Sequence, residues 1–121
     1  MRYRRHESLR YVFKDPIPAH FKIIKVDNTP VNTSEGPGTI MDMSPGGLKL
    51  SANFRIPLRS KIQLSIRTTI ANIQLQFAAD LLWAKENPDS YHYGVGFIND
   101  HHEEVVEVLK KFRKSTPEER E

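Results

Sequence analysis

Short runs in which apolar and polar residues alternate occupy much of the chain between residues 17 and 98. In the clearest run, residues 61–67, Ile62, Leu64 and Ile66 alternate with polar side chains. A period of two places successive side chains on opposite faces of a β-strand, so this run predicts a strand with one buried face. Similar alternation predicts strands at 17–26, 73–83 and 91–98. The side chains expected to face inward in these strands are Ala19, Phe21, Ile23, Ile73, Leu75, Phe77, Ala79, Leu81, Trp83, Tyr93, Val95 and Phe97.

Two shorter apolar runs, 38–41 and 48–51, flank the sequence Asp-Met-Ser-Pro-Gly-Gly at residues 42–47. Proline fixes φ and glycine permits a positive φ, so this sequence predicts a tight turn between two strands. Other segments rich in Pro, Gly, Asn, Asp and Ser predict connections between strands. These connections are expected at Asp15-Pro16, 27–38, 54–60, 69–72 and 86–90.

A single helix is expected near the C-terminus. Asp100 can cap its first turn, with Glu103 three residues later. The apolar residues that follow recur at helical spacing and predict a stripe that packs over one end of the strands. They are Val105, Val108, Leu109 and Phe112. Lys110, Lys111, Arg113 and Lys114 then occupy the last turns, where cations interact favourably with the helix dipole.

About six short antiparallel strands with turn-rich connections predict a mainly β fold, either a small barrel or a sandwich. The chain has 121 residues, which fits one domain with one modest core. We expect a flexible basic segment over residues 1–15, the folded domain over 16–114, and a disordered acidic tail over 115–121.

Composition excludes several classes of protein. The chain contains no cysteine, which excludes disulfides, thiolate nucleophiles and cysteine-bound zinc. No apolar run approaches the roughly 18 residues of a membrane span, so no membrane insertion and a cytoplasmic location are expected.

The net charge is only +3, but the first ten residues hold Arg2, Arg4, Arg5 and Arg10 against Glu7 alone. Such a cluster suits an anionic partner, and it is also what a solvated chain terminus looks like.

No catalytic or metal-binding pattern is present. The five histidines, at positions 6, 20, 92, 101 and 102, show no metal-ligand spacing. Ser44 has no general base at a fixed spacing that would make it a nucleophile. The sequence therefore predicts a protein that is not an enzyme and that holds no metal or cofactor.

The polar residues of the 42–47 turn allow two interpretations. Asp42 and Ser44 can cap the backbone of the turn itself. Alternatively, a carboxylate, a hydroxyl and the free amide groups near Gly46 and Gly47 can bind a ligand.

Three stretches, taken in order, resemble the PilZ domain family. The turn at 42–47 matches the family's Asp/Asn-x-Ser-x-x-Gly motif, and an apolar strand follows it. Leu81-Leu82-Trp83 is similar to the family's Val-Val-Trp strand, and 94–97 (Gly-Val-Gly-Phe) to its last strand. The likeness extends from about Arg4 to Phe112. It implies a six-stranded antiparallel PilZ-type β-barrel with a C-terminal α-helix.

The resemblance also implies a ligand, cyclic di-GMP, and the residues that hold it. The family's Arg-Arg-x-x-x-Arg motif aligns with Arg5, His6 and Arg10, so His6 replaces the second arginine. In an alternative alignment Arg5 is that second arginine and the spacer is one residue longer. Ligand-binding residues carried over or adjacent to the motifs are Arg4, Arg5, His6, Arg10, Asp42, Ser44, Gly46 and Gly47.

The function implied is a cyclic di-GMP receptor that changes the conformation of its N-terminal segment and signals to an unidentified protein effector. Losing one charge-assisted contact at His6 costs about 1.5–3 kcal/mol, or roughly ten- to a hundredfold in affinity. The alternative is a degenerate PilZ adaptor that binds a protein without nucleotide, which the change at His6 favours. Nucleic acid is not an expected partner, because only the basic charge of the N-terminus supports it.

Overall fold

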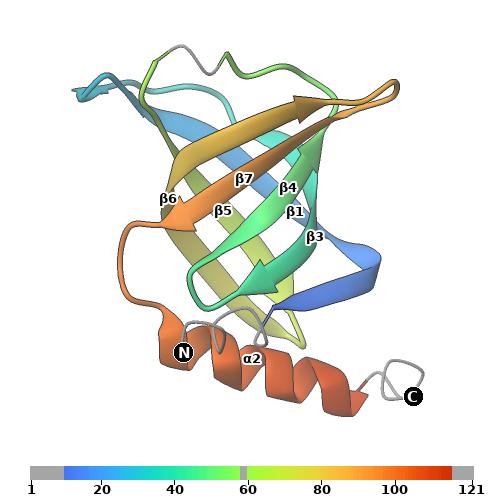
Figure 1. Cartoon of the computed structure of the whole chain (residues 1–121). Helices are drawn as coiled ribbons and strands as arrows, with labels where there is room; N and C mark the ends of the chain where they lie inside the picture. Colours follow the sequence, from blue (N-terminus) through green and yellow to red (C-terminus); the bar gives the residue numbers. More distant parts are fainter. Residues whose placement is uncertain (1–9, 58–59, 116–121) are drawn as a thin grey trace, which may run out of the picture.

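The computed structural model describes residues 10–57 and 60–115, which form a closed β-barrel with one helix across its end (Figure 1). Six strands make the barrel, in the order β1-β3-β4-β7-β6-β5, and β5 pairs back with β1. All pairings are antiparallel, and a short strand, β2, pairs outside the barrel with the end of β1. The predicted mainly β, six-stranded barrel is confirmed. The strands are β1 (Tyr11–Val26), β2 (Thr29–Pro30), β3 (Gly36–Ser44), β4 (Gly47–Ala52), β5 (Ile62–Ile70), β6 (Ile73–Glu86) and β7 (Tyr91–Phe97).

Strand β1 is longer than the sequence indicates. It begins at Tyr11, and the predicted turn at Asp15-Pro16 is wrong, because both residues lie inside the strand. The pairing with β3 shifts register between Val12 and Ile17. A proline has no N–H to donate to a ladder, so this irregularity accommodates Pro16 without ending the strand.

The inward face of the barrel is largely the one predicted from alternation. Its most buried large side chains are Tyr93, Phe77, Ile40, Met43, Leu50, Leu64, Ile66 and Ile70. Tyr93 lies inside the barrel and satisfies its hydroxyl with the backbone of the 53–57 connection. The hydroxyl donates to the carbonyl of Phe54 (2.9 Å) and accepts from the N–H of Ile56 (2.7 Å).

Two tight hairpin turns use residues in the left-handed conformation. Asp27 and Asn28 connect β1 to β2, and Ala71 and Asn72 connect β5 to β6, all four with positive φ. Consecutive positive φ values give the turn type whose twist matches that of paired strands.

Helix α2 (His102–Ser115) closes the end of the barrel where β1 begins. Asp100 caps it, since its Oδ1 accepts the N–H of His102 at 3.0 Å. Val105, Val108 and Leu109 are buried as predicted. The ring of Phe112 packs edge-on against the rings of Tyr11 and Phe13, which ties the last turns of the helix to the start of β1.

Candidate functional site

A row of outward-facing positions crosses five adjacent strands at the same level of the barrel. Successive pairings join Val12 to Asp42, Asp42 to Lys49, Lys49 to Gly94, and Gly94 to Trp83. We call these five residues the outer row. Their neighbours along the strands, such as Met43, Leu48 and Val95, face the core and are buried. The outer row is therefore held in place by the packing beneath it.

Asp42 is the charged centre of the outer row. Its Oδ1 forms an ion pair with Nη1 of Arg10, the residue just before β1, and Lys49 Nζ lies 3.8 Å from its Oδ2. The Asp42 side chain is only 10% exposed, whereas that of Arg10 is 46% exposed. The structure thus brings together two predicted site residues that are 32 positions apart in the chain. It does not support the interpretation of Asp42 as a cap for the turn.

The turn after β3 is tighter than predicted. Asp42 to Ser44 belong to β3, and only Pro45 and Gly46 form the turn. None of the six glycines has a positive φ, so backbone freedom does not explain the two glycines here. The Ser44 hydroxyl lies 3.4 Å from the carbonyl of Gly47, a long hydrogen bond that leaves the hydroxyl able to serve a stronger partner.

Gly47 is required by a close approach between strands. A Cβ added there would lie 2.1 Å from the carbonyl oxygen of Val95 on β7, whereas one added to Gly46 would meet nothing within 4 Å. The carbonyl of Gly46 accepts the N–H of Phe97 at 2.9 Å, which fixes the turn against β7.

The predicted burial of Trp83 is wrong. The β6–β7 register shifts between Leu81 and Trp83, so the alternation along β6 is interrupted. Leu81 faces the core, Leu82 is 61% exposed, and Trp83 is 42% exposed. The indole covers Gly94, where a Cβ would lie 2.0 Å from Trp83 Nε1. Glycine at this position lets an aromatic surface lie close to the strand backbone beside Lys49.

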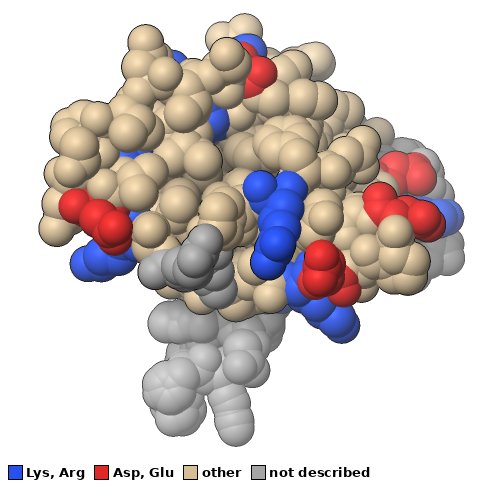
Figure 2. Space-filling view, turned by 90° about the horizontal axis from the view of Figure 1, so that it is seen from above, with Lys and Arg blue, Asp and Glu red and all other residues tan. Residues whose placement is uncertain are grey.

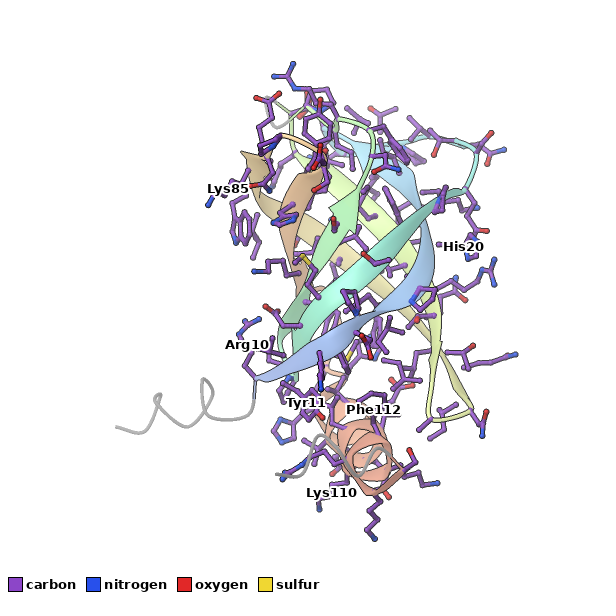
Figure 3. All side chains as sticks on the ribbon, turned by 90° about the vertical axis from the view of Figure 1, so that its right-hand side faces the viewer. Arg10, Tyr11, His20, Lys85, Lys110 and Phe112 are labelled. Carbon is purple, nitrogen blue, oxygen red and sulfur yellow. The ribbon has the colours of Figure 1, made fainter. Side chains whose placement is uncertain are left out.

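Positive charge continues from Lys49 toward the far end of this face. His92 on β7 pairs with Lys85 on β6, one outward position beyond Gly94 and Trp83. Burial, followed by the charges of Lys49 and Lys85, lowers the pKa of His92, so its ring is neutral at pH 7. Figure 3 shows Arg10 and Lys85 on one side of the barrel and His20 on the other.

The structure places the predicted residues Arg10, Asp42 and Ser44 and the two turn glycines close to one another, and it adds Lys49 and Trp83, which the sequence analysis does not name as site residues, to the same face. Gly94 and Gly96 could have indicated the position of Trp83. These two glycines take outward positions on the strand paired with β6, where the lack of a side chain leaves room for an aromatic ring. Arg4, Arg5 and His6 lie outside the described residues. Among residues 10–57 and 60–115, no group of three or more His, Asp or Glu side chains is placed to hold a metal ion.

The family model described as the PilZ domain matches residues 4–113. The chain belongs to the PilZ domain family. PilZ domains bind cyclic di-GMP as a family and serve as binding and adaptor domains rather than enzymes. The match covers the outer row, the turn at 42–47 and most of helix α2.

A solved PilZ domain shares the fold. The crystal structure of the PilZ domain of CeSA from a cellulose-synthesizing bacterium superposes with a TM-score of 0.52 at 16% sequence identity. The alignment covers 86% of this chain and 91% of that one. No curated protein matches the chain. Within the part of this PilZ domain that the structure describes, no helix has the length and apolar character needed to cross a membrane.

The contrast between the two turn glycines gives a stability prediction. We expect Gly47→Ala to cost about 2 kcal/mol or more in the free energy of unfolding, because the new methyl group forces β4 away from β7. Gly46→Ala, in open space one residue earlier, is the matched control and should change stability by less than about 0.5 kcal/mol. Urea unfolding of both variants measures the difference. Equal stabilities would contradict the close approach at Gly47.

Proposed function

We propose that this PilZ domain is a receptor for cyclic di-GMP that binds the ligand on the outer row and the adjoining turn. Binding then changes the conformation of the N-terminal segment and signals to a protein partner. The observation that carries the proposal is the Arg10–Asp42 ion pair, which joins the two family motifs on a face that also carries the exposed indole of Trp83, with the largely buried Ser44 beside Asp42.

The groups on this face match the chemistry of a guanine nucleotide. A carboxylate such as Asp42 can accept the N1–H and N2–H₂ donors of a guanine edge. The guanidinium of Arg10 has five N–H donors and engages Asp42 through Nη1. Its remaining donors suit a guanine O6 and N7 or a phosphate oxygen. Charge-assisted contacts of this kind are the stronger class of hydrogen bond.

Trp83 supplies a surface for stacking. Aromatic side chains that stack on nucleic-acid bases contribute about 1–3 kcal/mol per base. The exposed indole lies over Gly94, which pairs with Lys49, and the Lys49 ammonium is within 4 Å of Asp42. A base stacked on Trp83 would therefore lie toward both charges. One nucleotide half could therefore use Asp42 and Ser44 while an aromatic contact holds another part of the ligand.

Arg4, Arg5 and His6 precede Arg10 in the sequence and, by the family resemblance, complete the site. With His6 in place of an arginine, one charge-assisted contact is lost, and we expect micromolar rather than nanomolar affinity. The adjacent Arg4 offers a second guanidinium that can substitute in part. The same change favours the alternative function, an adaptor that binds a protein partner without nucleotide.

Calorimetric titration with cyclic di-GMP, beside GTP as the control ligand, tests receptor function. We expect selective binding by the wild type and at least tenfold weaker binding by Arg10→Ala and Asp42→Ala, since each variant removes a charged group that is proposed to contact the ligand. Arg67→Ala is the matched control, because it breaks an exposed arginine–carboxylate ion pair, with Glu35 at 2.8 Å, on a strand that carries no residue of the outer row. If the wild type shows no binding at saturating cyclic di-GMP, the receptor proposal is wrong and the adaptor function remains.

Amide hydrogen exchange tests the conformational part of the proposal. On adding cyclic di-GMP, exchange over residues 2–14 should slow, because arginines that hold the ligand can no longer sample other conformations. Exchange at the 69–72 turn, which joins β5 to β6 and carries no residue of the outer row, serves as the internal control and should not change. Bound ligand with unchanged exchange over residues 2–14 would contradict this mode of signalling.

A further inference from the structure

An open hollow lies where the start of β1, the Pro45 turn and helix α2 meet. Its volume is about 240 Å³. The lining combines apolar side chains, such as Pro45 and Leu109, with three cations. The lining residues are Arg10, Tyr11, Pro45, Val106, Leu109, Lys110 and Arg113.

The charge of this lining is of one sign. Arg10, Lys110 and Arg113 contribute to it, and no carboxylate does. Neither Lys110 nor Arg113 forms an ion pair with another residue of the described ranges 10–57 and 60–115. The barrel end opposite helix α2 is different, since Figure 2 shows Lys, Arg, Asp and Glu intermixed there. Arg10 is paired with Asp42, so Lys110 and Arg113 are the two cations of the hollow without an acidic partner, and they favour an anionic ligand.

Stabilisation of the helix dipole does not explain why Lys110 and Arg113 line the hollow. Cations anywhere in the last turns of α2 satisfy the dipole, and Lys111 and Lys114 do so at positions that do not line the hollow. Lys110 and Arg113 instead continue the stripe of Val106 and Leu109 at helical spacing, so they face the same side of the helix.

Packing on the adjacent, buried side of the helix fixes how α2 sits against β1. Phe112, between Lys110 and Arg113 in sequence, packs against Tyr11 and Phe13 of β1 at ring-centroid distances of 5.7 and 5.2 Å. Figure 3 shows Tyr11 and Phe112 between the barrel and the helix that carries Lys110. The backbone positions of the two cations are therefore set before any ligand binds, which lowers the cost of binding.

Arg10 belongs both to the hollow and to the ion pair with Asp42. A ligand in contact with Asp42 and Arg10 therefore lies beside the hollow, and cyclic di-GMP carries two phosphate groups. We propose that helix α2 forms part of the ligand site, with Lys110 and Arg113 binding a phosphate of the cyclic dinucleotide in the hollow beside Arg10. This inference rests on the proposed function, and it means that helix α2 contacts the bound ligand directly.

A pair of double variants tests the role of the helix. Lys110→Gln with Arg113→Gln should weaken cyclic di-GMP binding about tenfold or more, because two phosphate contacts are lost. Lys111→Gln with Lys114→Gln removes the same net charge from exposed positions of the same helix outside the hollow, and should weaken binding less than about threefold. Calorimetric titration gives both dissociation constants, and circular dichroism confirms that the variants keep the helix.

The outcomes separate this inference from the proposed function. If the wild type binds, Arg10→Ala does not, and the two double variants have equal affinity, the helix has no specific role while the receptor function stands. Equal weakening in both double variants would also overturn the inference, since it would reveal only a general effect of charge. If the wild type does not bind cyclic di-GMP, the receptor function and this inference both fall.

Discussion

The fold and the site both depend on the pairing of β1 with two other strands. Near its start β1 pairs with β3, and from Ala19 to Val26 it pairs with β5, which closes the barrel. Closure removes the free sheet edges that would otherwise expose unpaired backbone groups. The same pairing of Val12 with Asp42 brings Arg10 to the carboxylate, so one strand connects the two family motifs. Ring contacts from Tyr11 and Phe13 then place helix α2 beside them.

The outer row consists of functional groups whose positions are fixed by the core residues of the same strands. Core residues such as Met43, Leu48 and Val95 fix the strands, while the outward position next to each carries a charge, a glycine or an indole. Gly94 is small because Trp83 covers it, and Gly47 is small because β7 approaches closely. Sites built on paired strands hold their groups more accurately than sites on loops. The proposed cyclic di-GMP site therefore needs a conformational change only in the N-terminal segment, residues 2–14, and none in the rest of the barrel.

Alternation in the sequence was sufficient to predict most of the barrel and its inward face, because burial on one side of a strand imposes a period of two. The prediction failed at Trp83, where a register shift breaks that period. It also failed at the start of β1, where Pro16 indicates a turn although the strand continues through an irregular pairing. The proximity of Arg10 to Asp42 came only from the family resemblance, since nothing local joins residues 32 positions apart. Lys110 and Arg113 could be placed on the helix but not beside Arg10, because their position depends on how the helix docks.

The most direct test of the account is a two-dimensional amide NMR titration of the wild type with cyclic di-GMP. The chain has one tryptophan and six glycines, so the Trp83 indole signal and the glycine amides are readily followed. We predict the largest shifts at Trp83, Ser44, Gly46, Gly47, Lys49 and Gly94, with little change at the Ala71-Asn72 turn. No shifts at saturation, or shifts confined to residues away from the outer row and its turn, would contradict it.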